Sequence, residues 1–597
     1  MKISIAQINP TIGDLAGNAQ QILAAAQQAS QQGARLLLTT ELSLCGYPPR
    51  DLLMQPAFIA EIASTLTQLA QSLPAELAVL VGTVVLNECS PHTGGKPLFN
   101  STALLLGGKA QQLFRKRLLP TYDVFDEYRY FEPGQQSSFF TLDGVRVGVT
   151  ICEDLWNDEK FWGRRNYATD PLAELVEQGV DLIVNLSGSP YFVAKQKLRE
   201  AMLQQATQTY GQPILYANQV GGNDDLIFDG SSVGFNRQGE LICRGKAFET
   251  DLISVDFDPT TRDLQSAAIA PQPETDDAEI WAALVMGVRD YMRKCGFSKV
   301  VLGLSGGIDS SLVAAVAVAA VGAENVLGVL MPSPYSSDHS VKDALDLARN
   351  LGMQTQILPI GELMKSFDQT LTELFAGTEF GLAEENIQSR IRGTLLMAIS
   401  NKFGYLLLST GNKSEMAVGY CTLYGDMNGG LAAIADVPKT RVYSICQWLN
   451  QGNWSTNDNN QFNIIDKTLC IIPENVIHKA PSAELKPGQV DQDSLPPYEI
   501  LDDILNQFIS QHKSPAEIVA SGHEAVTVDR VVKLVTRAEF KRKQAPPGLK
   551  ITDRAFGTGW RMPIANRWLP VSQGSPLEAN TITQVEKVGV GIVGDRA

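Results

Sequence analysis

Residues 299–322, KVVLGLSGGIDSSLVAAVAVAAVG, place an apolar strand, a loop with two adjacent glycines and an apolar helix directly after one another. An unbroken apolar strand is typical of a parallel sheet that is covered on both faces. The glycines let the loop backbone approach a ligand closely, and the free N–H groups at the start of the helix attract anions. The stretch therefore predicts a parallel α/β fold with an anion-binding loop at 305–310. The loop is not of the Walker A type, because the pattern GxxxxGKS/T is absent.

The rest of the chain extends this α/β pattern over two domains. Its 597 residues are about four times the ~150 residues of one domain. Short β-rich runs alternate with helical runs on both sides of a stretch at 256–277 that is rich in Pro, Asp and Thr, so we place the domain boundary near residue 270. The expected organisation is a first domain at 1–265, a linker at 266–278, a second domain at 279–566 with an Asn-rich surface insertion near 451–469, and a C-terminal tail at 567–597 without a readable motif.

The overall charge and apolarity limit the possible partners. The formal net charge is −16, from 49 Lys and Arg against 65 Asp and Glu, which argues against binding to nucleic acid or anionic lipid. The longest apolar run, at 312–321, is about half the ~20 residues needed to span a bilayer. The eight cysteines are dispersed without a CxxC pattern, which is typical of reduced thiols. We therefore expect a cytoplasmic protein whose partners are small molecules, with no nucleic acid and no membrane.

Three reactive side chains in the first half each follow a predicted strand: Glu41, Lys116 and Cys152. Functional groups gather where the strands of an α/β sheet end, so the three could converge. A cysteine attacks as its thiolate and needs a group that takes its proton, and a lysine can stabilise the oxyanion that forms on a substrate carbonyl. Each residue alone is more often a packing or surface residue. Together they predict a site for nucleophilic catalysis.

The sequence around these residues resembles the nitrilase (carbon–nitrogen hydrolase) superfamily over residues 1 to about 260. The motifs, in family order, are TTELSLCGYPPRDLL, FRKRLLPTYDVFDEYRYFEPG, GVTICEDLW and NLSGSPY. The resemblance implies an α-β-β-α sandwich in which Cys152 is the nucleophile, Glu41 the general base and Lys116 the cation beside the oxyanion. The strings LPTYDVFDE and NLSGSPYFVAK are similar to the glutamine-hydrolysing branch. That similarity implies a glutamine site formed by Tyr122, Glu127, Ser189 and Lys195.

The loop SGGIDSS resembles the pyrophosphate-binding loop of N-type ATP pyrophosphatases, which adenylate a substrate oxygen. A carboxylate beside a triphosphate would repel it without a cation, so Asp309 is expected to hold Mg2+. The segment STGNKSEMAVGYCTLYGD follows another predicted strand. In it Thr410 could face the adenosine, Lys413 could meet phosphate, and Glu415 could be a second ligand of the metal or the substrate.

Further motifs of the second half resemble the NAD synthetase family, which implies a doubly wound parallel sheet of the Rossmann-like, adenine nucleotide α-hydrolase-like type. They are ENIQSRIRG, TGNKSE, YGD, DVPKT and FKRKQAPPG, in order. The implied ATP site comprises Gly303, Leu304, Ser305, Gly306, Gly307, Ile308, Asp309, Ser310 and Thr410. The implied deamido-NAD contacts are Asn386, Arg390, Glu415 and Lys543, and the implied metal ligands are Asp309 and Glu415. The spacing also places Asn386 and Arg390 on one helical face.

Taken together, residues 1 to about 566 resemble the glutamine-dependent members of the NAD synthetase family. The resemblance implies ATP-dependent amidation of deamido-NAD to NAD+ with ammonia from L-glutamine, which yields AMP, pyrophosphate and glutamate. It implies Mg2+ with ATP, no organic prosthetic group, and a homodimer or larger homo-oligomer formed through the synthetase domain. Another glutamine amidotransferase that adenylates a different carboxylate stays open as an alternative. A binding module without catalysis is disfavoured, because Glu41, Lys116, Cys152, Asp309 and Glu415 are all present.

Overall fold

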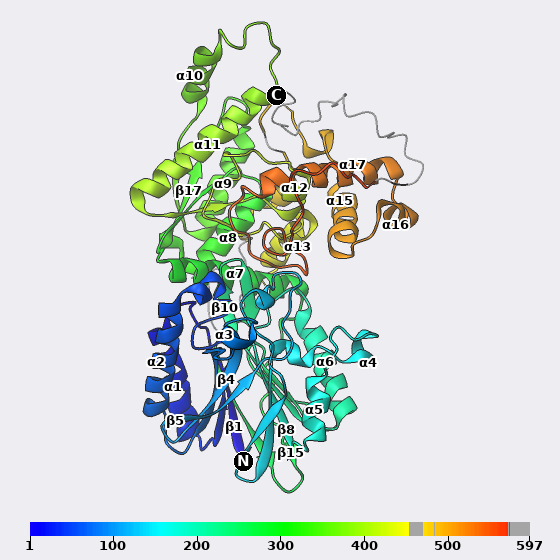
Figure 1. Cartoon of the computed structure of the whole chain (residues 1–597). Helices are drawn as coiled ribbons and strands as arrows, with labels where there is room; N and C mark the ends of the chain where they lie inside the picture. The colour runs from blue at the N-terminus through cyan, green and yellow to red at the C-terminus, as the bar shows by residue number, and fades with distance from the viewer. Residues whose placement is uncertain (453–469, 483, 487, 571, 573–597) are drawn as a thin grey trace. The chain divides into compact units, whose positions relative to one another are not determined.

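The computed structural model describes residues 1–452, 470–482, 484–486, 488–570 and 572. The chain divides into two compact units, Met1–Glu274 and Thr275–Ala597 (Figure 1). The predicted insertion lies almost entirely outside the described residues, as does most of the predicted tail. Among the helices of the described residues, none combines the length and apolarity that a bilayer crossing requires.

The first unit contains two sheets. The seven-stranded sheet has the order β15-β14-β1-β2-β3-β4-β5, with β1 Lys2–Gln7, β2 Leu36–Leu38, β3 Ala78–Leu86, β4 Leu98–Leu106, β5 Lys109–Arg115, β14 Asp251–Asp258 and β15 Asp263–Leu264. The six-stranded sheet has the order β13-β12-β9-β8-β7-β6, with β6 Ser138–Leu142, β7 Val145–Ile151, β8 Leu182–Ser187, β9 Ile214–Asn218, β12 Val233–Phe235 and β13 Leu241–Arg244. A separate two-stranded ribbon pairs β10 Val220–Asn223 with β11 Leu226–Asp229.

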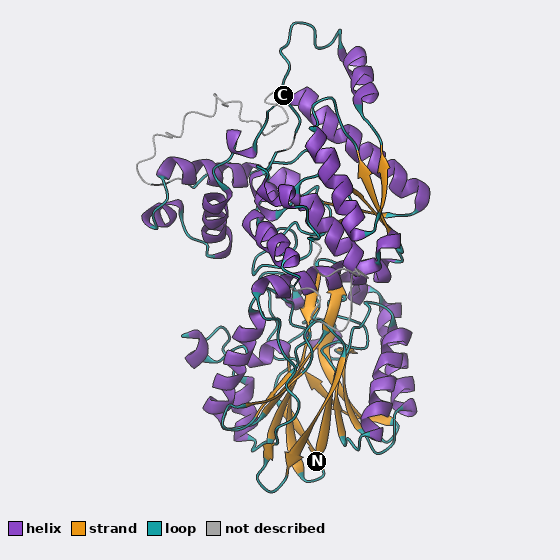
Figure 2. Cartoon of the chain, turned by 180° about the vertical axis from the view of Figure 1, so that it is seen from behind, coloured by secondary structure: helices purple, strands orange, loops and turns teal. Residues whose placement is uncertain are grey.

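Four longer helices flank these sheets (Figures 1 and 2). They are α1 Leu15–Gln31, α2 Pro56–Ser72, α5 Pro171–Glu177 and α6 Lys195–Tyr210. The alternation of side chains along each strand explains the layers. Leu36 packs in the core between the sheets with Val147, whereas the next residue, Leu37, packs with Ile22 of α1. The predicted α-β-β-α sandwich is confirmed, and central strands such as β2 and β8 are buried along their whole length because both of their faces are covered.

The second unit is built on a five-stranded parallel sheet in the order β18-β17-β16-β19-β20. Its strands are β16 Val300–Gly303, β17 Val326–Leu330, β18 Gln354–Ile357, β19 Leu406–Ser409 and β20 Leu431–Ala432. The strand order reverses at β16, which has β17 on one side and β19 on the other. The predicted doubly wound fold is confirmed. Ligands bind such sheets at the carboxyl ends of the strands that flank the reversal.

Helices cover both faces of this sheet. Helices α8 Ile308–Val321, α9 Asp338–Leu351 and α11 Leu382–Phe403 pack against its strands, and α7 Asp276–Cys295 and α13 Lys439–Asn450 pack on α8. The remaining helices are α10 Gly361–Leu371, α12 Lys413–Val418, α14 Glu474–His478, α15 Tyr498–Leu505, α16 Pro515–Ala520, α17 Ala525–Arg537 and α18 Glu539–Arg542. Because α8 packs against α7 and α13 as well as the sheet, it is apolar on nearly all sides. Helices α12, α15, α16 and α17 share a separate apolar core.

Candidate active sites

In the first unit, Cys152 occupies a sharp turn at the end of β7. Strand β7 ends at Ile151, and a short 3-10 helix, Cys152–Leu155, begins at the cysteine. Cys152 has a φ of 44°, in the left-handed region that non-glycine residues rarely adopt, and its side chain is buried. Its carbonyl accepts a hydrogen bond from Asn185 of β8 at 3.4 Å. Residues held in such a backbone conformation cluster at functional sites.

Glu41, Lys116 and Glu127 form one buried network. The Lys116 ammonium donates to Glu41 Oε1 at 2.7 Å and to Glu127 Oε1 at 2.8 Å. Asn100 also donates to Glu41 Oε1, at 2.7 Å, and the Gly188 N–H donates to Glu41 Oε2 at 2.9 Å. All three charged side chains are 5% exposed or less. Both carboxylates therefore bind the same ammonium group, and the hydrogen bonds to Glu41 fix the orientation of its carboxylate.

The charges of this network act on the cysteine. Burial opposes the charge of Lys116, but Glu127 and Glu41 raise its pKa well above the ordinary value, and the Cys152 thiolate adds to this effect. Burial raises the pKa of the Cys152 thiol, and Glu41 raises it further, whereas Lys116 and a hydrogen bond from Ser187 lower it. The resting cysteine is thus a thiol. It requires a proton acceptor when it attacks.

Two glycines allow the loop of Glu41 to lie in this position. A Cβ on Gly82 of β3 would lie 2.2 Å from the Thr40 carbonyl oxygen and 2.4 Å from the Leu42 nitrogen. A Cβ on Gly188 would lie 3.0 Å from the Tyr47 ring and 3.3 Å from Glu41 Oε2. Real Cβ atoms do not approach backbone as closely as 2.2 Å. The backbone at Gly82 therefore supports the loop directly.

Of the residues that were predicted to hold glutamine, Tyr122 binds a buried carboxylate, Glu153, which the sequence reasoning missed, whereas Glu127 belongs to the Lys116 network. The Tyr122 hydroxyl donates to Glu153 at 3.0 Å, and the Tyr167 hydroxyl donates to it at 2.9 Å. Burial raises the pKa of Glu153, whereas the charge of Lys116, the hydrogen bonds from the two tyrosines and, least of all, the charge of Lys195 lower it. Ser189 is buried, and its N–H donates to a side chain of β9. The position of Glu153 directly after Cys152 was the signal that could have identified it.

In the second unit, the segment Ser305–Ser310 forms a compact loop between β16 and α8. The Ser305 and Ser310 hydroxyls lie 3.1 Å apart, and the Ser310 hydroxyl donates to the Gly307 carbonyl at 3.0 Å. Gly306 has a φ of 74°, and a Cβ there would lie 2.2 Å from the carbonyl oxygen of Ser340. Only glycine fits this close approach. The backbone of the loop therefore lies against the first turn of α9. The first N–H groups of α8 remain available to an anion.

Asp309 and Glu415 converge on one lysine, Lys439. Its ammonium lies 2.5 Å from Asp309 Oδ2 and 3.2 Å from Glu415 Oε1, and Asn412 donates to Asp309 Oδ1 at 2.9 Å. Burial raises the pKa of Glu415, Lys439 lowers it, and Asp309 raises it further. No cluster of three or more His, Cys, Asp or Glu side chains suited to a metal occurs in the part of the chain that the structure describes. Mg2+ is usually held by one or two carboxylates with substrate phosphates and water, so this pair fits it.

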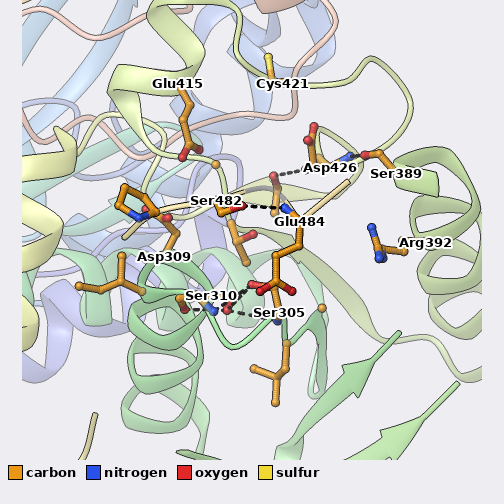
Figure 3. A pocket seen from close by; sticks show the side chains of 18 of the residues that line it. Ser305, Asp309, Ser310, Ser389, Arg392, Glu415, Cys421, Asp426, Ser482 and Glu484 are labelled. Atoms are coloured by element: carbon orange, nitrogen blue, oxygen red, sulfur yellow. Dashed lines mark hydrogen bonds between the residues drawn. The ribbon is translucent and has the colours of Figure 1, made fainter. Parts of the chain in front are cut away.

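These groups surround a cavity of about 290 Å³ at the carboxyl ends of β16 and β19 (Figure 3). Nine of the predicted residues line it: Gly303, Leu304, Ser305, Gly307, Ile308, Asp309, Ser310, Thr410 and Glu415. Further polar residues at the cavity are Ser389, Arg392, Asp426, Lys439 and Glu484. Sequence reasoning missed Lys439, although its motif DVPKT was recognised.

Other predicted residues lie outside this cavity lining. Asn386 accepts a hydrogen bond from the Thr422 hydroxyl at 2.8 Å, and Arg390 donates to the Leu423 carbonyl at 3.2 Å. Lys543 lies 3.6 Å from Glu539. The ammonium of Lys413 points elsewhere, to Asp436 at 2.8 Å and to Thr552 at 2.6 Å, so its predicted role at phosphate has no support in its contacts.

Two family models match the chain: carbon-nitrogen hydrolase over residues 2–265 and NAD synthase over residues 280–545. A glutamine-dependent NAD(+) synthetase from Synechocystis sp. is 57% identical over 573 residues, which cover 96% of this chain and 100% of the relative. One from Thermotoga maritima is 44% identical over 602 residues, which cover 95% and 99%. The solved structure of the Acinetobacter baumannii glutamine-dependent NAD+ synthetase with ADP matches with a TM-score of 0.73 and 40% identity, and covers 95% of this chain and 98% of that one.

The two folds and their sites thus define a class of protein in which a carbon–nitrogen hydrolase domain with a cysteine, a glutamate and a lysine is joined to an NAD synthase domain. The two relatives match this combination over almost their whole length, at 57% and 44% identity. The chain belongs to the glutamine-dependent NAD(+) synthetase family. The resemblance that the motifs of both halves indicated is confirmed.

Proposed function

We propose that the protein catalyses ATP-dependent amidation of deamido-NAD(+) to NAD(+) with ammonia taken from L-glutamine, and that it releases AMP, pyrophosphate and glutamate. The observation that carries this proposal is the pair of sites on one chain. Cys152 lies in the field of the Glu41–Lys116–Glu127 network, and an anion-binding loop lies beside two converging carboxylates. A thiol site of this kind releases ammonia, and a nucleotide site of this kind consumes it.

In the first unit, Glu41 takes the thiol proton as Cys152 attacks the glutamine carboxamide carbon. Lys116 then faces the oxyanion of the tetrahedral intermediate, where a buried ammonium is most effective. The proton that Glu41 holds passes to the leaving ammonia, and water releases glutamate from the thioester in a second attack through the same base. Glu127 keeps Lys116 charged and oriented at 2.8 Å.

Binding of glutamine is assigned to Tyr122, Ser189 and Lys195, with Glu153 added. A buried carboxylate that already accepts two tyrosine hydroxyls suits the α-ammonium of glutamine, because a charge-assisted hydrogen bond in a buried site is strong. Lys195 has the complementary charge for the α-carboxylate. Specificity for an amino acid amide follows from these opposite charges.

In the second unit, the loop 305–310 holds the ATP phosphates through its backbone N–H groups, and Thr410 contacts the adenosine. Asp309 and Glu415 are proposed to hold Mg2+, which would neutralise the triphosphate and favour departure of pyrophosphate. Lys439, which lies between them, supplies a cation to the same phosphates. Asn386, Arg390, Glu415 and Lys543 are assigned to deamido-NAD, whose nicotinate carboxylate is adenylated before ammonia displaces AMP.

We also propose that the chain forms a homodimer or larger homo-oligomer through its second unit. Helix α10 buries none of its residues and exposes Leu363 and Phe367, and the adjoining helix α11 ends at Phe403, which is 62% exposed (Figure 1). Large apolar side chains exposed on neighbouring helices are found at interaction surfaces. Light scattering of the wild type and of Phe403→Glu tests the proposal. A wild type that is monomeric at micromolar concentration would contradict it.

The activity is tested with ATP, Mg2+ and deamido-NAD, supplied with either glutamine or ammonium chloride, while NAD(+), AMP and pyrophosphate are measured. Cys152→Ala should abolish glutamine-driven synthesis and leave ammonia-driven synthesis nearly intact. Cys243→Ala removes another buried cysteine of the first unit and is the matched control. Formation of ADP and phosphate, or absence of NAD(+), would reject the proposal. If another carboxylate were amidated instead, the alternative amidotransferase would be correct.

A further inference from the structure

One buried carboxylate joins the chain segments that carry the proposed cation and the proposed nucleophile. Asp154 lies in the short helix after β7 and is 3% exposed. Its Oδ1 accepts the N–H groups of Arg117 at 3.0 Å and Leu118 at 2.9 Å, the two residues that follow Lys116. Its Oδ2 accepts the N–H group of Ile151 at 3.0 Å, the residue before the nucleophile. One oxygen is thus bound to the backbone that follows Lys116 and the other to the backbone that precedes Cys152.

These two segments leave different sheets. Lys116 follows β5, at the edge of the seven-stranded sheet, whereas Cys152 follows β7, in the six-stranded sheet. Stacked sheets are held together mainly by side-chain packing, which does not direct the main chain as a hydrogen bond does. Asp154 therefore links the backbones of both sheets where their catalytic groups must meet.

We propose that Asp154 is a positioning residue of the glutaminase, which fixes the Lys116 ammonium relative to the Cys152 thiol. The inference rests on the proposed function of the first unit. It assigns Asp154 no contact with glutamine, because its oxygens are directed at backbone N–H groups. Its loss changes the position of Lys116 relative to Cys152, whereas Glu153, a proposed binding residue, stays next to Cys152 in the same short helix. A misplacement of this kind lowers the rate of the chemical step rather than the affinity.

The protonation state of Asp154 is consistent with this role. Burial raises its pKa to about 6, although the N–H groups of Ile151 and Leu118, the charge of Lys116 and the N–H group of Arg117 lower it. At pH 7.5 the group is therefore a carboxylate with two acceptor oxygens. A carboxamide has a single acceptor oxygen, and in Asp154→Asn its NH2 group must face an N–H donor on one side or the other.

The experiment compares Asp154→Asn with the wild type at pH 7.5 in the full-length enzyme. Four quantities are measured: kcat and KM for glutamine-driven NAD(+) synthesis, the rate of ammonia-driven synthesis, and the rate at which iodoacetamide alkylates Cys152. The matched control is Asp181→Asn. Asp181 is 4% exposed and accepts the Arg146 N–H at 2.9 Å, but it lies at the opposite end of β8 from the site.

We expect the Asp154→Asn enzyme to lose about 10- to 100-fold in glutamine-driven kcat, with KM changed less than about threefold and ammonia-driven synthesis within about twofold of wild type. Alkylation of Cys152 should slow in parallel, and Asp181→Asn should change none of the four quantities beyond about twofold. A kcat within about twofold of wild type, or a loss that appears in KM alone, would overturn the inference.

If Asp154→Asn loses ammonia-driven synthesis as well, a second variant, Asp154→Glu, tests the inference. The quantity compared with the wild type is then the ratio of the glutamine-driven rate to the ammonia-driven rate. Glutamate keeps two acceptor oxygens on a longer arm, so the ratio should fall at least about fivefold, and an unchanged ratio would overturn the inference. Failure of the proposed function itself looks different, because the wild type would then form no NAD(+) from glutamine.

Discussion

Gly82→Ala should disable the glutaminase by displacing the loop of Glu41. The added Cβ would lie 2.2 Å from the Thr40 carbonyl oxygen, whereas ordinary contact begins at 3.4 Å, so the loop or β3 must move by 3.4 − 2.2 = 1.2 Å. Glu41 follows Thr40 directly, and its carboxylate moves with the loop away from donors now at 2.7 to 2.9 Å. A misplacement of about 1 Å can cost about 100-fold in rate, which is about 2.7 kcal/mol in the activation barrier.

The assay measures glutamine-driven and ammonia-driven NAD(+) synthesis in the same preparation, with thermal unfolding as a check on folding. Gly148→Ala is the matched control. Its Cβ, also on a strand of the first unit, would lie 3.0 Å from a Leu175 side-chain carbon, which can adjust, and not against backbone. We expect only Gly82→Ala to lower the ratio of glutamine-driven to ammonia-driven rates. Equal ratios in both variants would refute the argument from the loop.

Three further predictions concern single side chains. Asp309→Asn should lower the rate of NAD(+) synthesis at least about 100-fold with either nitrogen source, because the converging carboxylates then carry less negative charge for the proposed cation. A loss of glutamine-driven synthesis alone would contradict this prediction. Glu153→Gln should raise the KM for glutamine about 10- to 100-fold with little change in kcat, since a charge-assisted hydrogen bond is worth about 1.5–3 kcal/mol. Steady-state kinetics measure both constants, and a fall in kcat alone would disprove the binding role of Glu153. Burial raises the pKa of Asp154 from 3.8 to about 6, so the folded chain keeps this proton to higher pH than the unfolded chain does. We therefore compare the free energies of unfolding of the wild type and of Asp154→Asn. The wild-type value minus the variant value should fall by up to ~3 kcal/mol as pH rises from about 4 to 6, and should then stay level. Urea denaturation across this range measures it, and a difference that rises with pH would be incompatible with the buried carboxylate.

The parts of the fold that the sequence predicted are those in which local pattern and tertiary packing agree. The apolar runs became strands because sheets and helices cover both of their faces, and the glycine loop after β16 lies at the reversal of strand order, as its pattern indicates. The predicted strand that Glu41 follows is short, Leu36–Leu38, because the Thr39 hydroxyl and N–H bind the Leu80 carbonyl and the chain turns before Glu41. A turn that depends on a distant strand has no local signal.

The direction of a side chain was the other feature that spacing could not predict. Asn386 and Arg390 do share a helical face, but that face binds the segment at Thr422 and Leu423, whereas Arg392 lines the cavity. Lys413 and Lys439 stand in equally recognisable motifs. Only the packing of α12 and α13 decides that the first pairs with Asp436 and the second with Asp309 and Glu415.

The division of the first site between two sheets has a consequence for assembly. Glu41 and Lys116 follow strands of one sheet and Cys152 follows a strand of the other, and the exposed residues 135–136 lie between β5 and β6. A chain cut there would yield one fragment with the proposed base and cation and another with the proposed nucleophile. Neither could hydrolyse glutamine by itself, so restored hydrolysis would report reassociation of the fragments. The glutaminase is therefore a natural candidate for a split-enzyme sensor.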